Sequence, residues 1–260
     1  HGGWALNISG DIRNFYKEMQ RMPSQAMAVV PVIMNSLHHD VMRGRKDRLG
    51  ELWVPICSSA MFDPQVMLDM ATNGMFVVQT YGATETCGDG IINYAQDAKH
   101  IGAVGQGNDY LDYKLEPDGE LCIRGDSIML GYYKDPEATA EVIDADGWFH
   151  TGDLARKDED GYYFLTGRKK NLIILDSGEN INPEELEGIV GKCEAVKECV
   201  VKEMGKKIGV VVYCDEDKQQ QVRDFITEAN RTLPLYKRMS AVEFSTEPLP
   251  RNGAGKLLRQ

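Results

Sequence analysis

Apolar and polar positions follow two different spacings over the first hundred residues. Between 11 and 22 the apolar residues recur every three or four positions, which predicts an amphipathic helix capped by Asp11. The β-branched run 26–30 predicts a strand, and helical spacing returns from Pro31 to 42. Residues 51–57 predict a second buried strand. This part of the chain therefore alternates helices with strands.

A third helix and a third strand lead into the segment Tyr-Gly-Ala-Thr-Glu at 81–85. Asp63 followed by Pro64 is typical of a helix start, and Gly74 is typical of its end. Residues 75–80 then predict a strand that runs into 81–85. Strands joined through helices pair in parallel, and ligands of such sheets bind beyond the carboxyl ends of the strands. We expect residues 81–85 to lie at such an edge.

The pattern changes after residue 105. Short segments punctuated by Gly and Asp predict antiparallel hairpins, interrupted by a helix that starts at Asp135-Pro136. A third pattern, from 172 onward, predicts a small α+β domain. The predicted fold class is α/β. Its expected parts are a parallel-sheet subdomain, an antiparallel β subdomain, a short connection and a C-terminal α+β domain, at residues 1–105, 106–167, 168–171 and 172–260.

Composition excludes several classes of protein. The formal net charge of −11 argues against a general binder of nucleic acid or anionic membranes, because such proteins need basic surfaces. Six cysteines without a Cys-x-x-Cys pair or a histidine at metal spacing favour reduced thiols in the cytoplasm. The chain has no apolar run near the roughly 20 residues that span a bilayer, so we expect no transmembrane segment.

The segment 81–85 offers three groups suited to a nucleotide. Tyr81 presents a flat face for a purine, the Thr84 hydroxyl suits a phosphate, and Glu85 supplies a hard oxygen ligand for Mg²⁺. The alternative is an ordinary turn after a strand with a solvated glutamate. That alternative is preferred when the five residues are taken alone.

Two further segments carry candidate binding residues. Asp153, fixed after Thr-Gly, suits the two hydroxyls of a ribose, although a hairpin aspartate explains it too. Arg168 opens the basic run 168–170, and its planar guanidinium suits a ribose or phosphate contact. A basic run between folded units is most often a surface cluster. We expect His150 to be structural, because we predict no serine, cysteine or metal group around it.

A glycine-flanked lysine, Lys256, lies near the end of the chain in Pro-Arg-Asn-Gly-Ala-Gly-Lys. From the local sequence alone, Lys256 is predicted to be an ordinary solvent-exposed charge. The order and spacing of the motifs change this interpretation, because together they closely resemble the second half of the adenylate-forming superfamily. The motifs are YGATE at 81–85, GYYKDPE at 131–137, WFHTGD at 148–153, GRKK at 167–170 and the segment 250–256.

The resemblance implies a role for each matching residue. The resemblance implies nucleotide binding by the adenine-lining positions and their turn. It implies phosphate contact for Thr84, Mg²⁺ for Glu85, the ribose for Asp153, and the ribose or a phosphate for Arg168. The adenine-side residues are Ser59, Ala60, Tyr81 and Gly82, where Ser58 and Ser59 replace two glycines typical of the family. Lys170 matches the hinge, and Gly178 matches the loop of the CoA channel. Lys256 matches the catalytic lysine that bridges the substrate carboxylate and the α-phosphate.

The resemblance implies an ATP-dependent acyl-CoA synthetase, which activates a carboxylate, with a fatty acid as the expected substrate, as acyl-AMP and transfers it to CoA. The segment GRKKNLIIL…GENINPEELE favours the long-chain acyl-CoA type. A Ser/Thr/Gly-rich phosphate loop ending in Pro-Lys-Gly is absent from the 260 residues. We therefore expect about half of a parent enzyme here, inactive by itself. An adenylation domain that loads a carrier protein, or a nucleotide-binding module without activity, remain alternatives.

Overall fold

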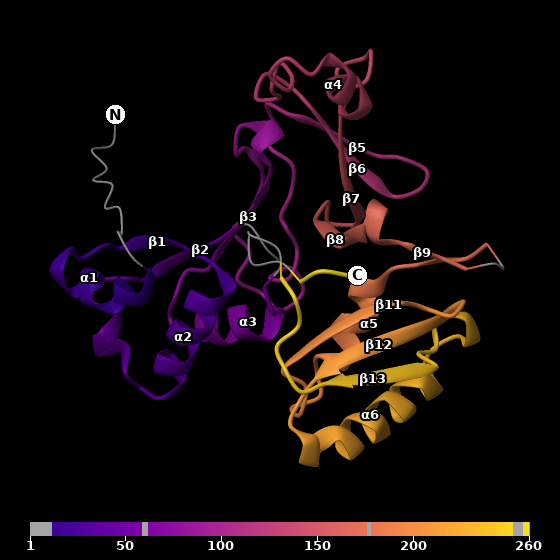
Figure 1. The fold of residues 1–260 in the computed structure, drawn as a ribbon. Helices are drawn as coiled ribbons and strands as arrows, with labels where there is room; N and C mark the ends of the chain where they lie inside the picture. Colours follow the sequence, from indigo (N-terminus) through magenta and orange to yellow (C-terminus); the bar gives the residue numbers. More distant parts are fainter. Residues whose placement is uncertain (1–11, 59–61, 176–177, 252–256, 260) are drawn as a thin grey trace. The chain divides into compact units, whose positions relative to one another are not determined.

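The computed structural model describes residues 12–58, 62–175, 178–251 and 257–259. The chain forms two compact units. The first comprises residues 1–151 and 155–165, and the second comprises residues 152–154 and 166–260. Figure 1 shows the course of the chain through these units, coloured along the sequence. Each unit has its own buried core.

A mixed sheet forms the N-terminal part of the first unit, with strand order β1-β2-β3-β4. The first three strands pair in parallel, and the fourth is antiparallel to the third. Their bounds are Ala26–Val29, Val54–Cys57, Val78–Gly82 and Gly90–Asn93. Helices α2, Pro31–Met42, and α3, Pro64–Thr72, form the connections between the parallel strands. The predicted α/β architecture is therefore confirmed in this part of the chain.

Local sequence signals explain where helix α3 begins and ends. The Asp63 side chain accepts a hydrogen bond from the Gln65 backbone N–H at 2.8 Å, and Pro64 occupies the first turn. Gly74 follows the helix with a φ of +88°, which favours glycine. Methionines dominate the adjoining core, where Met34, Met67 and Met70 are almost fully buried.

The helix predicted near the N-terminus differs in detail. A 3-10 turn, η1, covers Ile12–Asn14, and the α-helix α1 covers Phe15–Arg21. Asn14 stands at the N-cap position of α1 and makes no side-chain cap hydrogen bond. Asp11, the predicted cap, lies outside the described residues. A second 3-10 turn, η2, covers Lys46–Leu49.

The next sheet has strand order β5-β6-β7-β8. Strands β5 and β6 pair antiparallel, as the hairpin pattern predicts. The four strands span Asp112–Leu115, Glu120–Arg124, Phe149–Lys157 and Tyr163–Arg168. Helix α4, Pro136–Val142, begins where the sequence predicts, because the Asp135 side chain accepts from the Ala138 N–H at 2.9 Å.

The second unit is a small α+β domain built on the three-stranded sheet β11-β12-β13. Strands β11 and β12 are antiparallel, and β13 lies parallel to β12. Helix α6 lies along this sheet (Figure 1), and helices α5 and α6 contact each other. The bounds are Pro183–Val190 for α5, Glu198–Met204 for β11, Lys207–Tyr213 for β12, Gln219–Thr232 for α6 and Ala241–Ser245 for β13.

Smaller elements complete the second unit. A short ribbon pairs β9, Ile173–Ile174, with β10, Asn180–Ile181. The 3-10 turns are η4, Lys169–Asn171, η5, Glu216–Lys218, and η6, Leu235–Lys237. Within the described ranges, no helix combines the length and apolar character needed to cross a bilayer. All six cysteines are free thiols.

Candidate functional site

Two glycines fix the backbone where strand β3 ends. Gly82 pairs with Gly90 of β4, directly after Tyr81. A Cβ atom on Gly82 would lie 2.7 Å from the Asp89 carbonyl oxygen, and one on Gly90 would lie 2.2 Å from the Tyr81 carbonyl oxygen. Only glycine permits this close approach of the two strands. The strands are therefore closely paired up to the first residues of the predicted nucleotide segment.

Thr86 holds the turn that follows. Its buried hydroxyl accepts a hydrogen bond from the Ala83 N–H at 2.9 Å and lies 3.0 Å from the Ala83 carbonyl oxygen. These contacts close the 3-10 turn η3, Thr84–Thr86. Thr84 is left exposed, so its hydroxyl is accessible to a ligand. Sequence reasoning missed Thr86, although a threonine three residues after the turn start is a known capping signal.

The Glu85 carboxylate is half-buried and has a neutral partner. The Tyr132 hydroxyl donates to Glu85 Oε1 at 2.7 Å, and the Glu85 carbonyl oxygen accepts from the Met129 N–H at 2.8 Å. The hydrogen bond to Glu85, together with burial, raises the pKa of Tyr132, so the phenol stays a donor. Because the donor is neutral, the carboxylate keeps its full negative charge.

Tyr132 is a functional candidate that the sequence analysis did not name, although it did quote the motif at 131–137 that contains this residue. Its backbone N–H donates to Thr139 Oγ1 at 2.9 Å. A Cβ atom on Gly131, where φ is +144°, would lie 2.9 Å from the Thr139 side chain. The glycine thus lets the chain pass close to helix α4. The motif at 131–137 can therefore be explained as the support that aims Tyr132 at Glu85.

In the second unit, Asp153 and Arg168 are brought together as the sequence suggests. Arg168 Nε lies 3.5 Å from Asp153 Oδ1, and the two side chains are 41% and 21% exposed. Gly152, with a φ of +71°, turns the chain just before Asp153. A carboxylate and a guanidinium at this spacing present an acceptor and a set of donors side by side.

The predicted hinge residue Lys170 is exposed within the turn η4. Residues on both sides of it are tied to the start of helix α5. A Cβ atom on Gly167 would lie 2.2 Å from the Asn182 side chain, which caps α5 by accepting from the Glu184 N–H at 3.1 Å. Asn171 Nδ2 donates to Glu184 Oε1 at 2.6 Å. The hinge position therefore lies between two anchored neighbours.

Two arginines hold the C-terminal part of the chain to the second unit. Arg251 Nη2 lies 2.7 Å from Glu198 Oε1, on strand β11. Arg259 Nη2 lies 3.1 Å from Glu184 Oε1 and 2.6 Å from Glu187 Oε2, both on helix α5. These ion pairs stand on either side of residues 252–256 in the sequence. Neither arginine was predicted, because nothing local marks them.

Three predicted site residues, Ser59, Ala60 and Lys256, lie outside the described residues. Gly178 is described and has a φ of +92°. A Cβ atom there would meet nothing within 4 Å. The close approach expected at Gly178 is therefore not seen within the described residues, and the glycine requirement lies in the backbone angle.

One expectation about His150 is wrong. Its Nδ1 atom lies 3.4 Å from Cys122 Sγ, so a cysteine does lie beside it. The two residues are 28 positions apart and meet because they lie on the neighbouring strands β6 and β7. Spacing in the sequence could not reveal a pair formed by sheet pairing.

Two family descriptions match the chain. The description "AMP-binding enzyme" covers residues 4–133, and "AMP-binding enzyme C-terminal domain" covers residues 170–260. The chain belongs to the AMP-binding enzyme family. The resemblance that the motifs indicate is therefore confirmed, and the two matched regions occur in the expected order.

Curated relatives in this family include acid-CoA ligases. A long-chain-fatty-acid–CoA ligase of Yersinia pestis is 32% identical over 277 residues, which is 100% of this chain and 48% of the relative. A feruloyl-CoA synthase of Amycolatopsis sp is 35% identical over 233 residues, covering 84% of this chain and 47% of the relative. The chain thus spans about half the length of these relatives.

Solved structures show the same fold. O-succinylbenzoate Coenzyme A synthetase of Bacillus subtilis, in complex with ATP and magnesium ion, has a TM-score of 0.81 and 24% identity, covering 96% of this chain and 53% of that one. A fatty acyl CoA synthetase of Mycobacterium tuberculosis has a TM-score of 0.60 and 28% identity, covering 95% and 51%. The expected α/β fold is confirmed by these similarities.

Proposed function

We propose that the protein carrying this chain is an AMP-forming acid–thiol ligase, which activates a carboxylic acid with ATP and transfers it to CoA. One structural observation carries the proposal: Glu85 stands in the turn after the parallel strand β3, bound by the neutral hydroxyl of Tyr132. The ends of parallel strands are the usual ligand sites of such sheets. Family membership and the relatives' acid-CoA ligase names support the same reaction class.

The residues of the first unit are assigned to the nucleotide. Adenine contacts are assigned to Tyr81 and Gly82 and, from the family resemblance alone, to Ser59 and Ala60, and the exposed Thr84 hydroxyl is assigned to a phosphate. The donor set fits Mg²⁺, because Glu85 offers a carboxylate whose charge no cation cancels within the described residues. When bound, Mg²⁺ would neutralise phosphate charge in the substrate MgATP.

The residues of the second unit are assigned to the ribose and to catalysis. Asp153 accepts hydrogen bonds from the ribose hydroxyls, and Arg168 holds that carboxylate through the 3.5 Å contact. Lys256 neutralises the repulsion between the carboxylate and the α-phosphate as charge develops. We assign the hinge to residues 168–171, with Lys170 as the pivot and Gly178 in the CoA channel.

The reaction has two steps. A carboxylate oxygen attacks the α-phosphorus of ATP, which forms acyl-AMP and releases pyrophosphate. The CoA thiolate then attacks the acyl carbon, the carbon–oxygen bond breaks, and AMP leaves with that oxygen. A fatty acid is the substrate class suggested by the long-chain relative, and an aromatic acid is suggested by the feruloyl-CoA relative.

Product analysis with alternative acceptors tests the proposal. The protein carrying this chain is incubated with MgATP, a panel of fatty and aromatic acids, and either CoA or a phosphopantetheinylated carrier protein. We expect acid-dependent AMP and an acyl-CoA thioester identified by mass spectrometry. Transfer to the carrier protein alone would establish the carrier-loading alternative. ATP binding without any acid-dependent AMP would establish a binding module.

We also propose that the 260-residue chain by itself does not catalyse the first step. It contains no Ser/Thr/Gly-rich loop ending in Pro-Lys-Gly, and loops of that type hold the β- and γ-phosphates. Pyrophosphate exchange into ATP by the pure chain, with any carboxylate, would contradict this. Folding of the chain is checked in parallel by circular dichroism.

A further inference from the structure

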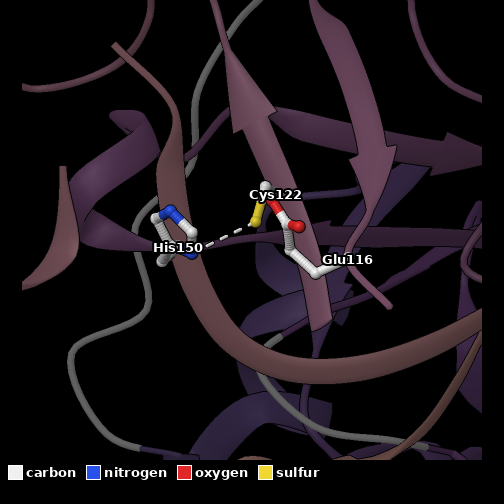
Figure 2. A group of neighbouring side chains, drawn as sticks. All are labelled: Glu116, Cys122 and His150. Atoms are coloured by element: carbon white, nitrogen blue, oxygen red, sulfur yellow. Dashed lines mark hydrogen bonds between the residues drawn. The ribbon is translucent and has the colours of Figure 1, made fainter. Parts of the chain in front are cut away.

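The sheet β5-β6-β7-β8 carries a group of three different metal-ligand side chains. Cys122 lies on β6, His150 on β7, and Glu116 directly after β5. Figure 2 shows the three side chains turned toward one another, and their ligand atoms all lie within 4.8 Å of one another. Cys122 is fully buried, while Glu116 and His150 are half-buried. All three belong to the first unit.

Two further carboxylates flank this group, and the Lys114 ammonium pairs with Glu116. Glu120 Oε2 lies 3.4 Å from His150 Nδ1, and Asp144 Oδ2 lies 3.4 Å from His150 Nε2. Burial, followed by the charges of Glu120 and Glu116, raises the pKa of the Cys122 thiol to about 12. A cation bound among these groups reverses that effect, because it stabilises the thiolate and neutralises the carboxylates.

We propose that Glu116, Cys122 and His150 form a binding site for Zn²⁺, through a carboxylate oxygen, Sγ and Nδ1. Zinc accepts sulfur, nitrogen and oxygen ligands together. With Zn–S of about 2.3 Å and Zn–N of about 2.05 Å, a tetrahedral site separates sulfur from nitrogen by about 3.6 Å. The distance from Cys122 Sγ to His150 Nδ1 is 3.4 Å, so little rearrangement is needed.

The contacts that neighbouring residues make with His150 and Glu116 support this assignment. His150 Nε2 lies 3.4 Å from Asp144 Oδ2, so Asp144 can hold the ring with Nδ1 toward the metal. Asp144 is itself fixed, because its Oδ1 accepts from the Asp146 and Trp148 N–H groups at 3.0 and 2.9 Å. Lys114 Nζ lies 2.6 Å from Glu116 Oε1, and Glu116 has a second oxygen for the cation. The fourth position is assigned to water.

The chemistry separates this site from that of MgATP. A thiolate and an imidazole select zinc, whereas Mg²⁺ prefers oxygen ligands. A second group, His100, Asp158 and Asp160, also has its ligand atoms within 4.8 Å. Each group has one carboxylate paired with a lysine, Glu116 with Lys114 and Asp160 with Lys99, but the second group contains no thiol. This second group serves as the internal comparison, and the zinc proposal does not depend on the ligase activity.

Cobalt and zinc titrations of the full 260-residue chain, stripped with a chelator, test the site. Co²⁺ reports sulfur ligation through a thiolate-to-cobalt charge-transfer band. We expect one equivalent of Co²⁺ to produce this band, Zn²⁺ to abolish it, and excess Mg²⁺ to leave it unchanged. No band, together with no Zn²⁺ bound in competition with a chromophoric chelator, would overturn the proposal.

Variants locate the bound metal. Cys122→Ala should abolish the band and His150→Gln should weaken binding at least about tenfold, while Asp144→Asn should weaken it by about tenfold. Cys57→Ala removes a buried thiol and Cys87→Ala an exposed one, and both should keep the band. A band lost in Cys87→Ala, or binding lost in His100→Gln but kept in His150→Gln, would contradict the assignment. Cys122→Ser repeats the test if the alanine variant unfolds.

Discussion

Glu85 of the first unit and Glu187 of the second are both half-buried carboxylates, and they differ in the charge of their partners. Glu85 Oε1 accepts from the neutral Tyr132 hydroxyl at 2.7 Å. Glu187 accepts from the Arg259 guanidinium at 2.6 Å and from the Val201 N–H at 2.8 Å. The Tyr132 hydroxyl orients Glu85 without cancelling its charge, whereas the Arg259 guanidinium offsets the charge of Glu187.

This difference separates a binding carboxylate from a structural one. A neutral donor leaves the charge of Glu85 available to an external cation, and a guanidinium cancels the charge of Glu187 within the fold. Even so, burial outweighs the arginine and raises the pKa of Glu187 to about 7. Under the proposed function, the partner's charge distinguishes Glu85, the carboxylate assigned to a ligand, from Glu187, which holds helix α5 to Arg259.

Replacing Lys256 in the protein that carries this chain should have the largest effect. Lys256→Ala should lower acyl-AMP formation by on the order of a hundredfold or more, because one preorganised charge contact is lost. Thioester formation from preformed acyl-AMP should persist. Pyrophosphate exchange measures the first step, and single-turnover thioester formation measures the second. Lys218→Ala, which changes an exposed lysine of the second unit, is the control. Equal loss in both steps would make Lys256 structural.

Fixing the hinge should give the opposite pattern. Proline at Lys170 sets φ near −65° and removes a donor, so the backbone can no longer change angle there. Lys170→Pro should leave acyl-AMP formation largely intact and slow the CoA step severely. Lys170→Ala, which leaves φ free, should keep both rates. A thioester step at full speed in the proline variant would show that residues 168–171 do not rotate.

The comparison between Glu85 and Glu187 can be tested directly with magnesium. Glu85→Gln should raise the Mg²⁺ concentration that gives half-maximal pyrophosphate exchange by about tenfold or more, as expected when a metal contact is lost. Tyr132→Phe removes one hydrogen bond to the carboxylate, worth about 1.5–3 kcal/mol, but leaves the Glu85 charge in place, so it should change the magnesium dependence less. Glu187→Gln should leave the magnesium dependence unchanged. The reverse order of effects would contradict the charge argument.

Stability, in contrast to catalysis, should depend on pH through Glu187. Its pKa is raised in the folded state from 4.5 to about 7, so folding favours the protonated form. The free energy of unfolding of the second unit should therefore fall as pH rises from about 4.5 to about 7, by about 2–3 kcal/mol. Glu187→Gln should flatten this slope and keep the acceptor for Val201.

Denaturant unfolding at a series of pH values measures this slope. Glu185→Gln changes an exposed glutamate on the same helix and should leave the slope as it is. Parallel pH profiles for the unmodified protein and Glu187→Gln would show that the buried carboxyl does not control stability. Arg259→Gln provides a further comparison, because it should raise the pKa of Glu187 and steepen the slope.

Local signals predicted much of the fold because they act over a few residues. Asp63 and Asp135, each followed by proline, mark two helix starts that the structure confirms. Strand β3 was predicted at 75–80 and lies at Val78–Gly82. The reason is that the Val77 N–H bonds to Gln96 Oε1 at 3.0 Å, outside the strand ladder. Strands β4 and β13 were not predicted from the hydrophobic pattern.

Residues of the candidate site could be predicted from the sequence only where they belong to a motif of the family. Tyr132 and Glu85 are 47 residues apart, and Arg259 and Glu187 are 72 apart. Such pairs depend on how whole elements pack, which no local spacing reveals. Cys122 and His150 escaped prediction for the same reason. The family's motifs predicted Asp153 and Arg168 together, and the structure places them 3.5 Å apart.

Oxygen transfer tests the central claim most directly. The protein carrying this chain is given MgATP, CoA and a carboxylic acid labelled with ¹⁸O in its carboxyl group, and the AMP is analysed by mass spectrometry. If the carboxylate attacks the α-phosphorus, each AMP formed should carry one ¹⁸O atom from the acid. AMP without label, or label recovered in inorganic phosphate or pyrophosphate, would contradict adenylation and the ligase assignment with it.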